Sequence, residues 1–310
     1  MNKINQLKNI KNLYAKGGNI IKYLKSIDGT KENSIEDILI SYDFQSGSYI
    51  KEYSKNSEFK SNYCSSLAKI IDKLGNFDSL MEVGVGEGTT LGPLLRKLDN
   101  HPKNVLGFDI SWSRLKFAKE ILIDFGFKDA TLFASNLFEI PLLDNSVDLI
   151  YTSHSLEPNG GREKQALAEL MRVARKYVIL LEPAYELADK KSKERMESHG
   201  YVTNLYQTAN DLGLEILDYR LFEHSINPLN PTGILILKKE SFQGNDCDLR
   251  CPVTLSKLDH ITESLLFSVE SNLSYPVIFN IPCLLKENSI LTSHLSTNYE
   301  EFKRINSIKF

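Results

Sequence analysis

The sequence predicts a doubly wound α/β fold with a helical N-terminal extension and a small C-terminal β-rich module. From residue 80 onward, short apolar runs alternate with helical stretches, which is typical of a parallel sheet covered by helices. Residues 1 to about 75 read as helical instead, and residues after 241 are rich in Ser, Asn and Leu without this rhythm. We therefore expect three parts: 1–75, 76–240 and 241–310.

Five apolar runs have the length of strands that are buried on both faces. They are residues 80–85, 105–110, 130–134, 147–151 and 177–181. Helical stretches lie between most of them, at 90–98, 113–125 and 162–173, and another follows at 202–212. Two strands, 215–222 and 233–238, come last. Their connection, which contains Pro228 and Pro231, is too short for a helical crossover, so we expect an antiparallel pair.

The N-terminal extension begins with a basic amphipathic helix. Six lysines precede the first acidic residue, Asp28, and apolar side chains recur among them at helical spacing (Ile4, Leu7, Ile10 and Tyr14). This helix either packs on the main domain with a solvated basic face or makes a peripheral contact with an anionic membrane or a charged partner. We expect breaks near Gly29 and Gly47.

Composition narrows the class of protein. The chain has 310 residues, enough for one large α/β domain and small appendages. Its net charge of −3 argues against a nucleic-acid substrate, since duplex binding depends on neutralising phosphates. No apolar run spans a bilayer, no signal peptide is visible and four cysteines are too few for a disulfide framework, so we expect a cytoplasmic protein. The oligomeric state is not indicated.

A glycine-rich turn joins the first predicted strand to the first helix. It reads Glu82-Val83-Gly84-Val85-Gly86-Glu87-Gly88. Glycines allow the backbone to approach a ligand closely, because no Cβ stands in the way. The dinucleotide fingerprint G-x-G-x-x-G would need its third glycine at Thr89, one position later. The turn therefore differs from that of a nicotinamide-binding protein.

Three further motifs follow in order. Asp109 ends the second strand, where a carboxylate can accept both hydroxyls of a ribose. Asn136 ends the third strand, and residues 148–150 lead into the fourth. Together with the glycine turn, these motifs resemble those of class I S-adenosylmethionine-dependent methyltransferases, over residues 80 to 239.

The resemblance implies a Rossmann-like methyltransferase sheet with S-adenosylmethionine as cofactor. The three glycines would lie under its methionine and ribose, Glu82 would hold the amino-acid end and Asp109 the ribose. Ile110 and Trp112 would flank the adenine, whose amino group would face Asn136, where the family usually has aspartate. The residues implied to bind the cofactor are Glu82, Gly84, Gly86, Gly88, Asp109, Ile110, Trp112, Asn136 and Leu137.

The segment 152–161 after the fourth strand places polar groups where a methyl acceptor should lie. His154 is the first candidate for a general base and Glu157 the second. His154 could instead cap the following helix or contact the cofactor. Other groups with a possible role in holding the substrate are Glu182, Tyr185, Gln45 and Tyr49.

The residues after the fourth strand also bear on the acceptor. Amino-methyltransferases often carry an Asn/Asp-Pro-Pro-aromatic motif there, whereas this chain has Glu157-Pro158-Asn159. We therefore expect a small-molecule or sugar hydroxyl as acceptor, such as a surface-glycan precursor, without excluding an amine. Two alternatives stay open: an RNA or protein methyltransferase with a fused activator module, and a non-catalytic scaffold that binds the cofactor.

Residues 248–286 resemble the small zinc-ribbon family that activates several tRNA and translation-factor methyltransferases. The resemblance departs at the metal ligands, because Thr254 and Phe267 stand where cysteines would fall. Structural zinc needs four N/S ligands, so we expect a metal-free β module that stabilises the catalytic domain or shapes its pocket. The alternative is an improvised zinc site from Cys247, Cys251, Cys283 and His260.

Overall fold

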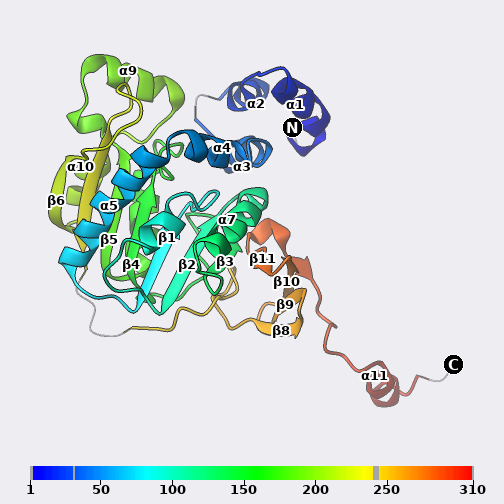
Figure 1. Ribbon diagram of the computed structural model, residues 1–310. Coiled ribbons are helices and arrows are strands. Elements are labelled where there is room, and N and C mark those ends of the chain that lie inside the picture. Colours follow the sequence, from blue (N-terminus) through cyan, green and yellow to red (C-terminus); the bar gives the residue numbers. More distant parts are fainter. Residues whose placement is uncertain (1–2, 31, 240–243, 309–310) are drawn as a thin grey trace.

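The computed structural model describes residues 3–30, 32–239 and 244–308. Its centre is a seven-stranded sheet with the strand order β3-β2-β1-β4-β5-β7-β6 (Figure 1). The strands are β1 (Ser79–Val83), β2 (Asn104–Asp109), β3 (Thr131–Ala134), β4 (Val147–Ser153), β5 (Ala174–Pro183), β6 (Glu215–Leu221) and β7 (Thr232–Lys238). β1 to β5 are parallel, and β7 runs antiparallel to both β5 and β6. The predicted α/β sheet and its antiparallel last pair are confirmed.

Helices cover both faces of this sheet, and each strand sends alternate side chains to the two layers. One layer holds α5 (Ser57–Leu74), α6 (Leu91–Leu95) and α7 (Trp112–Asp124), and the other holds α8 (Glu163–Val173) and α10 (Leu205–Asp211). In β1, for example, Leu80 joins the first layer while Met81 and Val83 join the second. The sheet therefore lies between two apolar cores, one on each face.

The N-terminal extension is helical, as predicted. After a short 3-10 turn (Lys3–Gln6) it consists of α1 (Leu7–Ala15), α2 (Ile20–Asp28), α3 (Ile35–Phe44), α4 (Ser48–Lys55) and α5, which also covers the sheet. Helices α1 to α3 share a small core of their own, formed by Ile10, Ile20, Leu24 and Ile40. Gly29 ends α2 in the left-handed conformation, at the expected break.

One helix of this domain was not predicted. It is α9 (Lys190–His199), which follows a 3-10 turn (Tyr185–Leu187). Its sequence is strongly charged, and Met196 is its one buried apolar side chain. The helix is defined by its ends, because Asp189 caps the first turn and Gly200 ends the last in the left-handed conformation.

A second, smaller antiparallel sheet forms the C-terminal module. Its strands are β8 (Asp259–Thr262), β9 (Leu265–Ser268), β10 (Leu273–Ile278), β11 (Ile281–Pro282) and β12 (Ile290–Leu291). The module adjoins the edge of the main sheet, where the Leu284 amide donates to the carbonyl of Ala134 at 2.8 Å. It covers the otherwise open β3 edge.

The chain continues into α11 (Tyr299–Ile305), which projects from the body of the molecule (Figure 1). The predicted boundary between residues 240 and 241 lies outside the described residues. Within the three described ranges, no helix is long and apolar enough to cross a membrane.

Candidate active site

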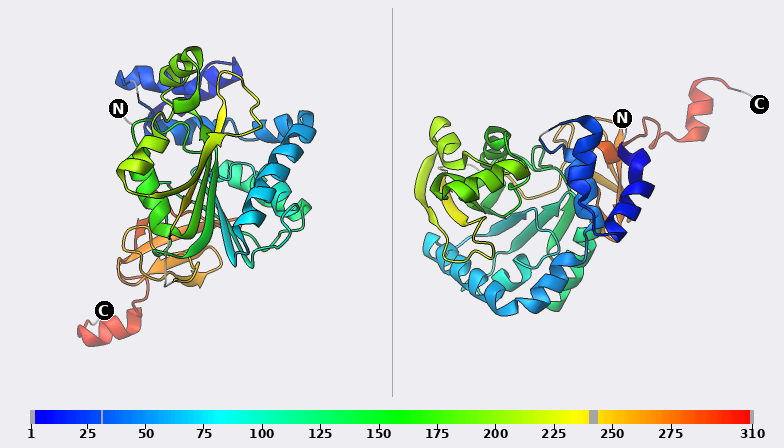
Figure 2. Two further views of the ribbon diagram at one scale, coloured as in Figure 1. Left: turned by 90° about the vertical axis from the view of Figure 1, so that its left-hand side faces the viewer. Right: turned by 90° about the horizontal axis from the view of Figure 1, so that it is seen from above.

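A cavity of about 370 Å³ opens at the carboxyl ends of the central strands. The turn after β1, the end of β2, the loops after β3 and β4 and the β6–β7 connection contribute to its wall. Helices α3, α4 and α5 complete it from the N-terminal extension, which lies at this end of the sheet (Figure 2). The cavity lies at the switch point between β1 and β4, where doubly wound sheets bind ligands.

The three glycines after β1 all have positive φ angles, between 54° and 75°. A Cβ on Gly84 would collide with Ser155, and one on Gly88 would meet the Ala118 backbone at 3.0 Å. A Cβ on Gly86 would meet only Arg114 Nη1, at 3.9 Å. Gly84 and Gly86 line the cavity and Gly88 does not, so Gly86 is the position where a side chain would fill ligand space.

The Asp109 carboxylate lies beside this turn at the end of β2. It accepts one backbone hydrogen bond from Gly86 at 2.9 Å and another from Ser111 at 2.8 Å. Burial raises the pKa of Asp109, against the opposing charge of Arg114 and the backbone hydrogen bonds. Each carboxylate oxygen keeps a lone pair, so a ligand with two adjacent hydroxyls can still donate to it.

Arg114 is a cavity residue that the sequence did not single out. Its guanidinium lies 4.5 Å from the ring centre of Tyr42 and 4.6 Å from that of Tyr49. The side chain is 5% exposed, and Nε donates to the Tyr42 carbonyl at 3.1 Å. Within the described part of the chain, Nη2 has no hydrogen-bond partner. A buried donor left open in a cavity indicates a polar ligand group.

Glu87 connects the glycine turn to the N-terminal extension. Its carboxylate accepts from the amides of Gly47 and Ile50, both at 2.8 Å, and so caps the start of α4. Asp43, at the end of α3, accepts from the Ser111 hydroxyl at 2.8 Å. The turn and the first residues of α7 thus hold α3 and α4 over the cavity.

Glu82 and Lys60 are two ionisable residues in the wall of the cavity. Glu82 is buried and accepts from the Tyr151 hydroxyl at 2.8 Å. Burial raises its pKa to about 8, although this hydrogen bond and the Lys60 charge act in the opposite direction. Burial lowers the pKa of Lys60, whose ammonium lies 4.8 Å from the ring centre of Tyr63.

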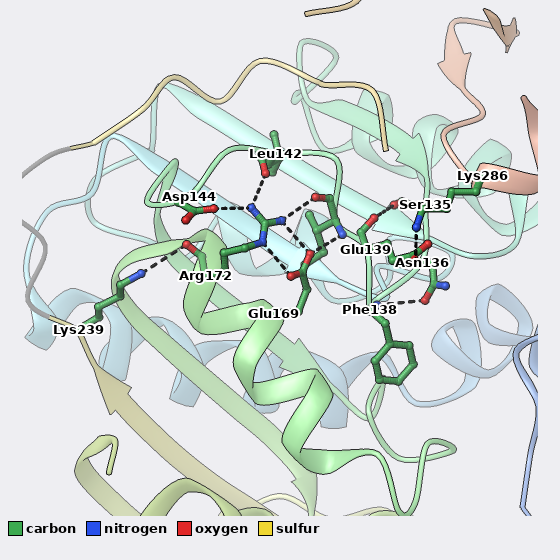
Figure 3. Close-up of polar contacts among 11 residues, drawn as sticks. Ser135, Asn136, Phe138, Glu139, Leu142, Asp144, Glu169, Arg172, Lys239 and Lys286 are labelled. Carbon is green, nitrogen blue, oxygen red and sulfur yellow. Dashed lines mark hydrogen bonds and ion pairs between the residues drawn. The ribbon is translucent and has the colours of Figure 1, made fainter. Parts of the chain in front are cut away.

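Asn136 and Leu137 line the cavity from the loop after β3, as does Ile110 from the end of β2. The Asn136 side-chain oxygen accepts from the Phe138 amide at 3.0 Å, which fixes the turn. Arg172 of α8 fastens the rest of this loop, because its guanidinium donates to the carbonyls of Ile140 and Leu142 (Figure 3).

His154 and Glu157 form a hydrogen-bonded pair in the loop after β4. His154 Nδ1 lies 2.6 Å from Glu157 Oε2, and Nε2 lies 2.9 Å from the Thr232 hydroxyl. A carboxylate only accepts, so Nδ1 carries the proton of the first bond. Burial acts to lower the pKa of His154, but the hydrogen bond and charge of Glu157 outweigh it and raise the pKa. His154 also has a φ of 56°, a strained conformation of the kind that clusters at functional sites.

Glu182 supports this loop from beneath. Its buried carboxylate accepts from the amides of Ser155, Leu156 and Glu157 at 3.0 to 3.1 Å. Burial raises the pKa of Glu182 to about 7. The expected contact between Glu182 and the substrate is replaced by a role in holding the loop, since Glu182 does not line the cavity.

Of the other predicted site residues, some line the cavity and others lie outside it. Tyr49 lines the cavity, whereas the Gln45 amide donates to Ser41 Oγ at 2.7 Å and does not. Tyr185 is also outside it and hydrogen-bonds to Glu197. Trp112, expected beside the adenine, lies 6.0 Å from Phe279 of the C-terminal module and is not a lining residue. These side chains were assigned by position along the chain, which does not indicate the direction of a side chain.

Several other lining residues carried no recognisable sequence signal. They come from α5, from the β6–β7 connection and from the start of β7, and they include Lys60, Tyr63, His224 and Thr232. No motif marks such residues, because only packing brings these segments to the cavity. The spacing of apolar residues in α5 predicts a helix, but it does not indicate that one side of this helix lines the cavity.

The arrangement can be tested against S-adenosylmethionine, a ligand with a ribose, an adenine and a charged amino-acid end. Gly86 leaves room for it, and Asp109 has free lone pairs for the ribose. Three buried polar atoms of described lining residues lack partners: Arg114 Nη2, Ser155 Oγ and Asn230 Oδ1. The residues present fit the cofactor. Fold and site together define a class I S-adenosylmethionine-dependent methyltransferase.

Comparison with known proteins agrees with this class. Residues 80–177 match the methyltransferase domain family, so this part of the chain is a methyltransferase domain, and the protein is an S-adenosylmethionine-dependent methyltransferase. The search of curated proteins finds no match.

Several solved structures of methyltransferases are similar to this chain at low sequence identity. Magnesium protoporphyrin IX methyltransferase from Synechocystis PCC 6803, with bound SAH, is 14% identical with a TM-score of 0.50, covering 65% of this chain and 99% of that one. A SAM-dependent methyltransferase from Aquifex aeolicus is 20% identical with a TM-score of 0.42, covering 55% and 87%. Geranyl diphosphate C-methyltransferase from Streptomyces coelicolor A3(2) is 13% identical with a TM-score of 0.44, covering 56% and 78%.

Proposed function

We propose that this enzyme transfers the methyl group of S-adenosylmethionine to a hydroxyl of a small molecule or sugar, with His154 as the general base. The observation that carries the proposal is the His154–Glu157 pair at the cavity wall, with Nδ1 and Oε2 2.6 Å apart. A hydroxyl must lose its proton when it is methylated, and a positioned base contributes about 10²–10⁴ in rate.

The cofactor supplies an electrophilic methyl group on a sulfonium sulfur. Asp109 would accept hydrogen bonds from the ribose hydroxyls of the cofactor, and Gly86 would leave room for the cofactor close to the backbone. Asn136, Ile110 and Leu137 would surround its adenine ring. The buried cation Arg114, which has an open donor, and the Lys60 ammonium are additional groups that could bind the anionic end of the cofactor. These assignments extend the sequence-based set by two residues.

Glu157 keeps His154 in the required tautomer. With Nδ1–H donated to the carboxylate, Nε2 has its lone pair available, and in this structure that nitrogen hydrogen-bonds to Thr232. An acceptor hydroxyl would either replace the threonine at Nε2 or pass its proton through it. Glu157 then stabilises the imidazolium that results, while Asn230 donates to the same carboxylate at 3.1 Å.

The shape of the cavity supports a small acceptor. Helices α3 to α5 cover it, and Ile226, Asn227 and Asn230 close it from the β6–β7 connection. In this proposal residues 1–75 act as a lid, residues 76–240 carry out the transfer and residues 241–310 support the β3 edge. The cavity of about 370 Å³ has the size of a small-molecule site, and the cofactor and the reacting part of the acceptor must both fit in it.

The test is a screen for transfer from methyl-labelled S-adenosylmethionine by the full-length protein. Hydroxyl acceptors, including sugars and glycan precursors, are compared with amines, bulk tRNA and protein. We expect label only in a hydroxyl compound, with the signal lost in His154→Ala and kept in His294→Ala, a control at a histidine on the C-terminal tail. Transfer to tRNA or protein alone would overturn the substrate class. Cofactor binding without transfer to any acceptor would identify a scaffold.

A further inference from the structure

Helix α1 has an inner and an outer side. On the inner side, Ile10 is fully buried against α2 and α3. Lys3, just before the helix, is also buried and pairs with Asp28 and Asp37, the latter at 2.6 Å. One of the six lysines of the basic segment is therefore used inside the protein, where it neutralises the nearest acidic side chains.

The outer side carries a mixed stripe of apolar and basic residues. Ile4, Leu7 and Tyr14 are 59%, 39% and 40% exposed, and Lys8 and Lys11 between them are exposed too. Their spacing of three and four residues places Leu7, Lys8, Lys11 and Tyr14 on one side of α1, and Ile4 lies in the 3-10 turn just before it. At the edge of this side, the Tyr14 ring also contacts Phe44 of α3, with ring centres 6.5 Å apart. Among the residues that the structure describes, Lys8 and Lys11 take part in no ion pair. The stripe is thus positively charged and rich in apolar surface.

We propose that this stripe (Ile4, Leu7, Lys8, Lys11 and Tyr14) docks on an anionic phospholipid bilayer. Lysines attract acidic headgroups, and the apolar side chains between them can enter the interfacial region. A nucleic acid would use the lysines but would leave the isoleucine and leucine in water, so the composition favours a bilayer. The helix lies on the outer rim of the molecule, where a flat surface can reach it (Figures 1 and 2).

The docking surface is one helix away from the cavity. α1 packs on the cluster that includes Ile40 of α3, and α3 presents Ile38 and Tyr42 to the cavity. A bilayer bound to α1 would therefore lie beside the lid of the active site. Docking would bring the cavity close to acceptors that reside in or at a membrane.

The experiment is co-sedimentation of the full-length protein with vesicles. Mixed phosphatidylserine–phosphatidylcholine vesicles are compared with pure phosphatidylcholine vesicles at low and high salt. Replacing Lys8 and Lys11 by glutamine should lower binding to the anionic vesicles about 30-fold, given the usual contribution of a lysine near such a surface. The double change Lys128→Gln and Lys164→Gln, at exposed lysines on other elements, alters net charge equally and should leave binding almost unchanged.

The apolar part is tested separately with Leu7→Ser against Leu187→Ser, at a leucine that is 43% exposed elsewhere. We expect only the first to weaken vesicle binding, and unchanged melting temperatures confirm that both variants fold. The proposal is overturned if the protein does not bind anionic vesicles, if the two lysine pairs behave alike, or if duplex RNA binds through Lys8 and Lys11 while vesicles do not. None of these outcomes depends on methyl transfer, so the proposed function is tested independently.

Discussion

The glycines of the turn after β1 have different roles. Gly84 and Gly88 are required by packing, because a Cβ on either would press against Ser155 or the α7 backbone. Gly86 has open cavity in front of it and is held by the carboxylate of Asp109. The residues with the clearest expected effect on the cofactor are therefore Gly86 and Asp109.

Gly86→Leu should abolish binding of S-adenosylmethionine, because the new side chain would occupy the ligand space. Its control is Gly29→Leu, which has a similar φ of +67° but no atom within 4 Å, so it reproduces the backbone strain alone. Asp109→Ala should weaken binding by about 1.5–3 kcal/mol, the usual contribution of hydrogen bonds to a charged group. Calorimetry measures all three, and tight binding of NAD in place of S-adenosylmethionine would contradict the site.

His154→Ala should slow single-turnover methyl transfer by about 10²–10⁴ without changing cofactor affinity. Neutral His154 is the base, and Glu157 holds its pKa above the usual value. The rate of the parent enzyme should therefore rise with pH through a midpoint above about 6.5 and fall at lower pH, as the imidazole becomes protonated. If the mutation mainly weakens cofactor binding, His154 holds the cofactor. A variant with native rate and affinity would make Glu157 the next residue to test.

At the scale of elements, the site depends on how the helical extension is attached. In the turn after β1, Glu87 accepts from the amides of Gly47 and Ile50 at the start of α4. Just before α7, the Ser111 hydroxyl donates to Asp43 at the end of α3. Arg114 stacks between two tyrosines of the same extension. The glycine turn after β1 and helices α3 and α4 are thus one hydrogen-bonded unit.

Glu87→Gln should loosen α4, because an amide can accept one of the two backbone hydrogen bonds but turns a donor toward the other. We expect a loss of about 1.5–3 kcal/mol of local stability. Hydrogen exchange at residues 47–55 should become faster, with weaker cofactor binding. Glu58→Gln, on an exposed position of α5, is the control. Unchanged exchange at α4 would show that the carboxylate does not hold the lid.

At the scale of the whole molecule, the C-terminal module shares its core with the catalytic sheet. Cys251, Leu266 and Tyr275 belong to the same buried cluster as Met81 of β1. The Cys251 thiol lies 3.4 Å from the Ser271 hydroxyl and 3.3 Å from that of Tyr275. Hydrogen bonds from these groups outweigh burial and lower the pKa of Cys251 to about 7. Within the described ranges, no three potential ligands gather into a metal site.

The purified protein should therefore contain far less than one zinc per chain, because hydroxyl groups rather than other metal ligands contact Cys251. Elemental analysis of the full-length protein measures this directly. Near-stoichiometric zinc that disappears in Cys251→Ser would show that the module is a functional zinc ribbon. The same variant should retain the melting temperature of the parent to within a few degrees if the module is metal-free.

The sequence alone was sufficient to predict the sheet, its antiparallel last pair and the glycine turn after the first strand. Buried strands appear as apolar runs, and the glycines and Asp109 stand at the ends of those runs, so local pattern carries this information. α9 was missed because it has one buried apolar side chain and is defined by its capping residues.

Only the tertiary structure decided which side chains face the cavity. Arg114 and Trp112 lie two residues apart, yet one is buried at the glycine turn and the other contacts the C-terminal module. Thr232 meets His154 across 78 positions of sequence, and Lys60 reaches the cavity from a helix before the first strand. Such contacts arise when distant segments pack together. Residue types and spacing along the chain record the period of each element but not the partner that it meets.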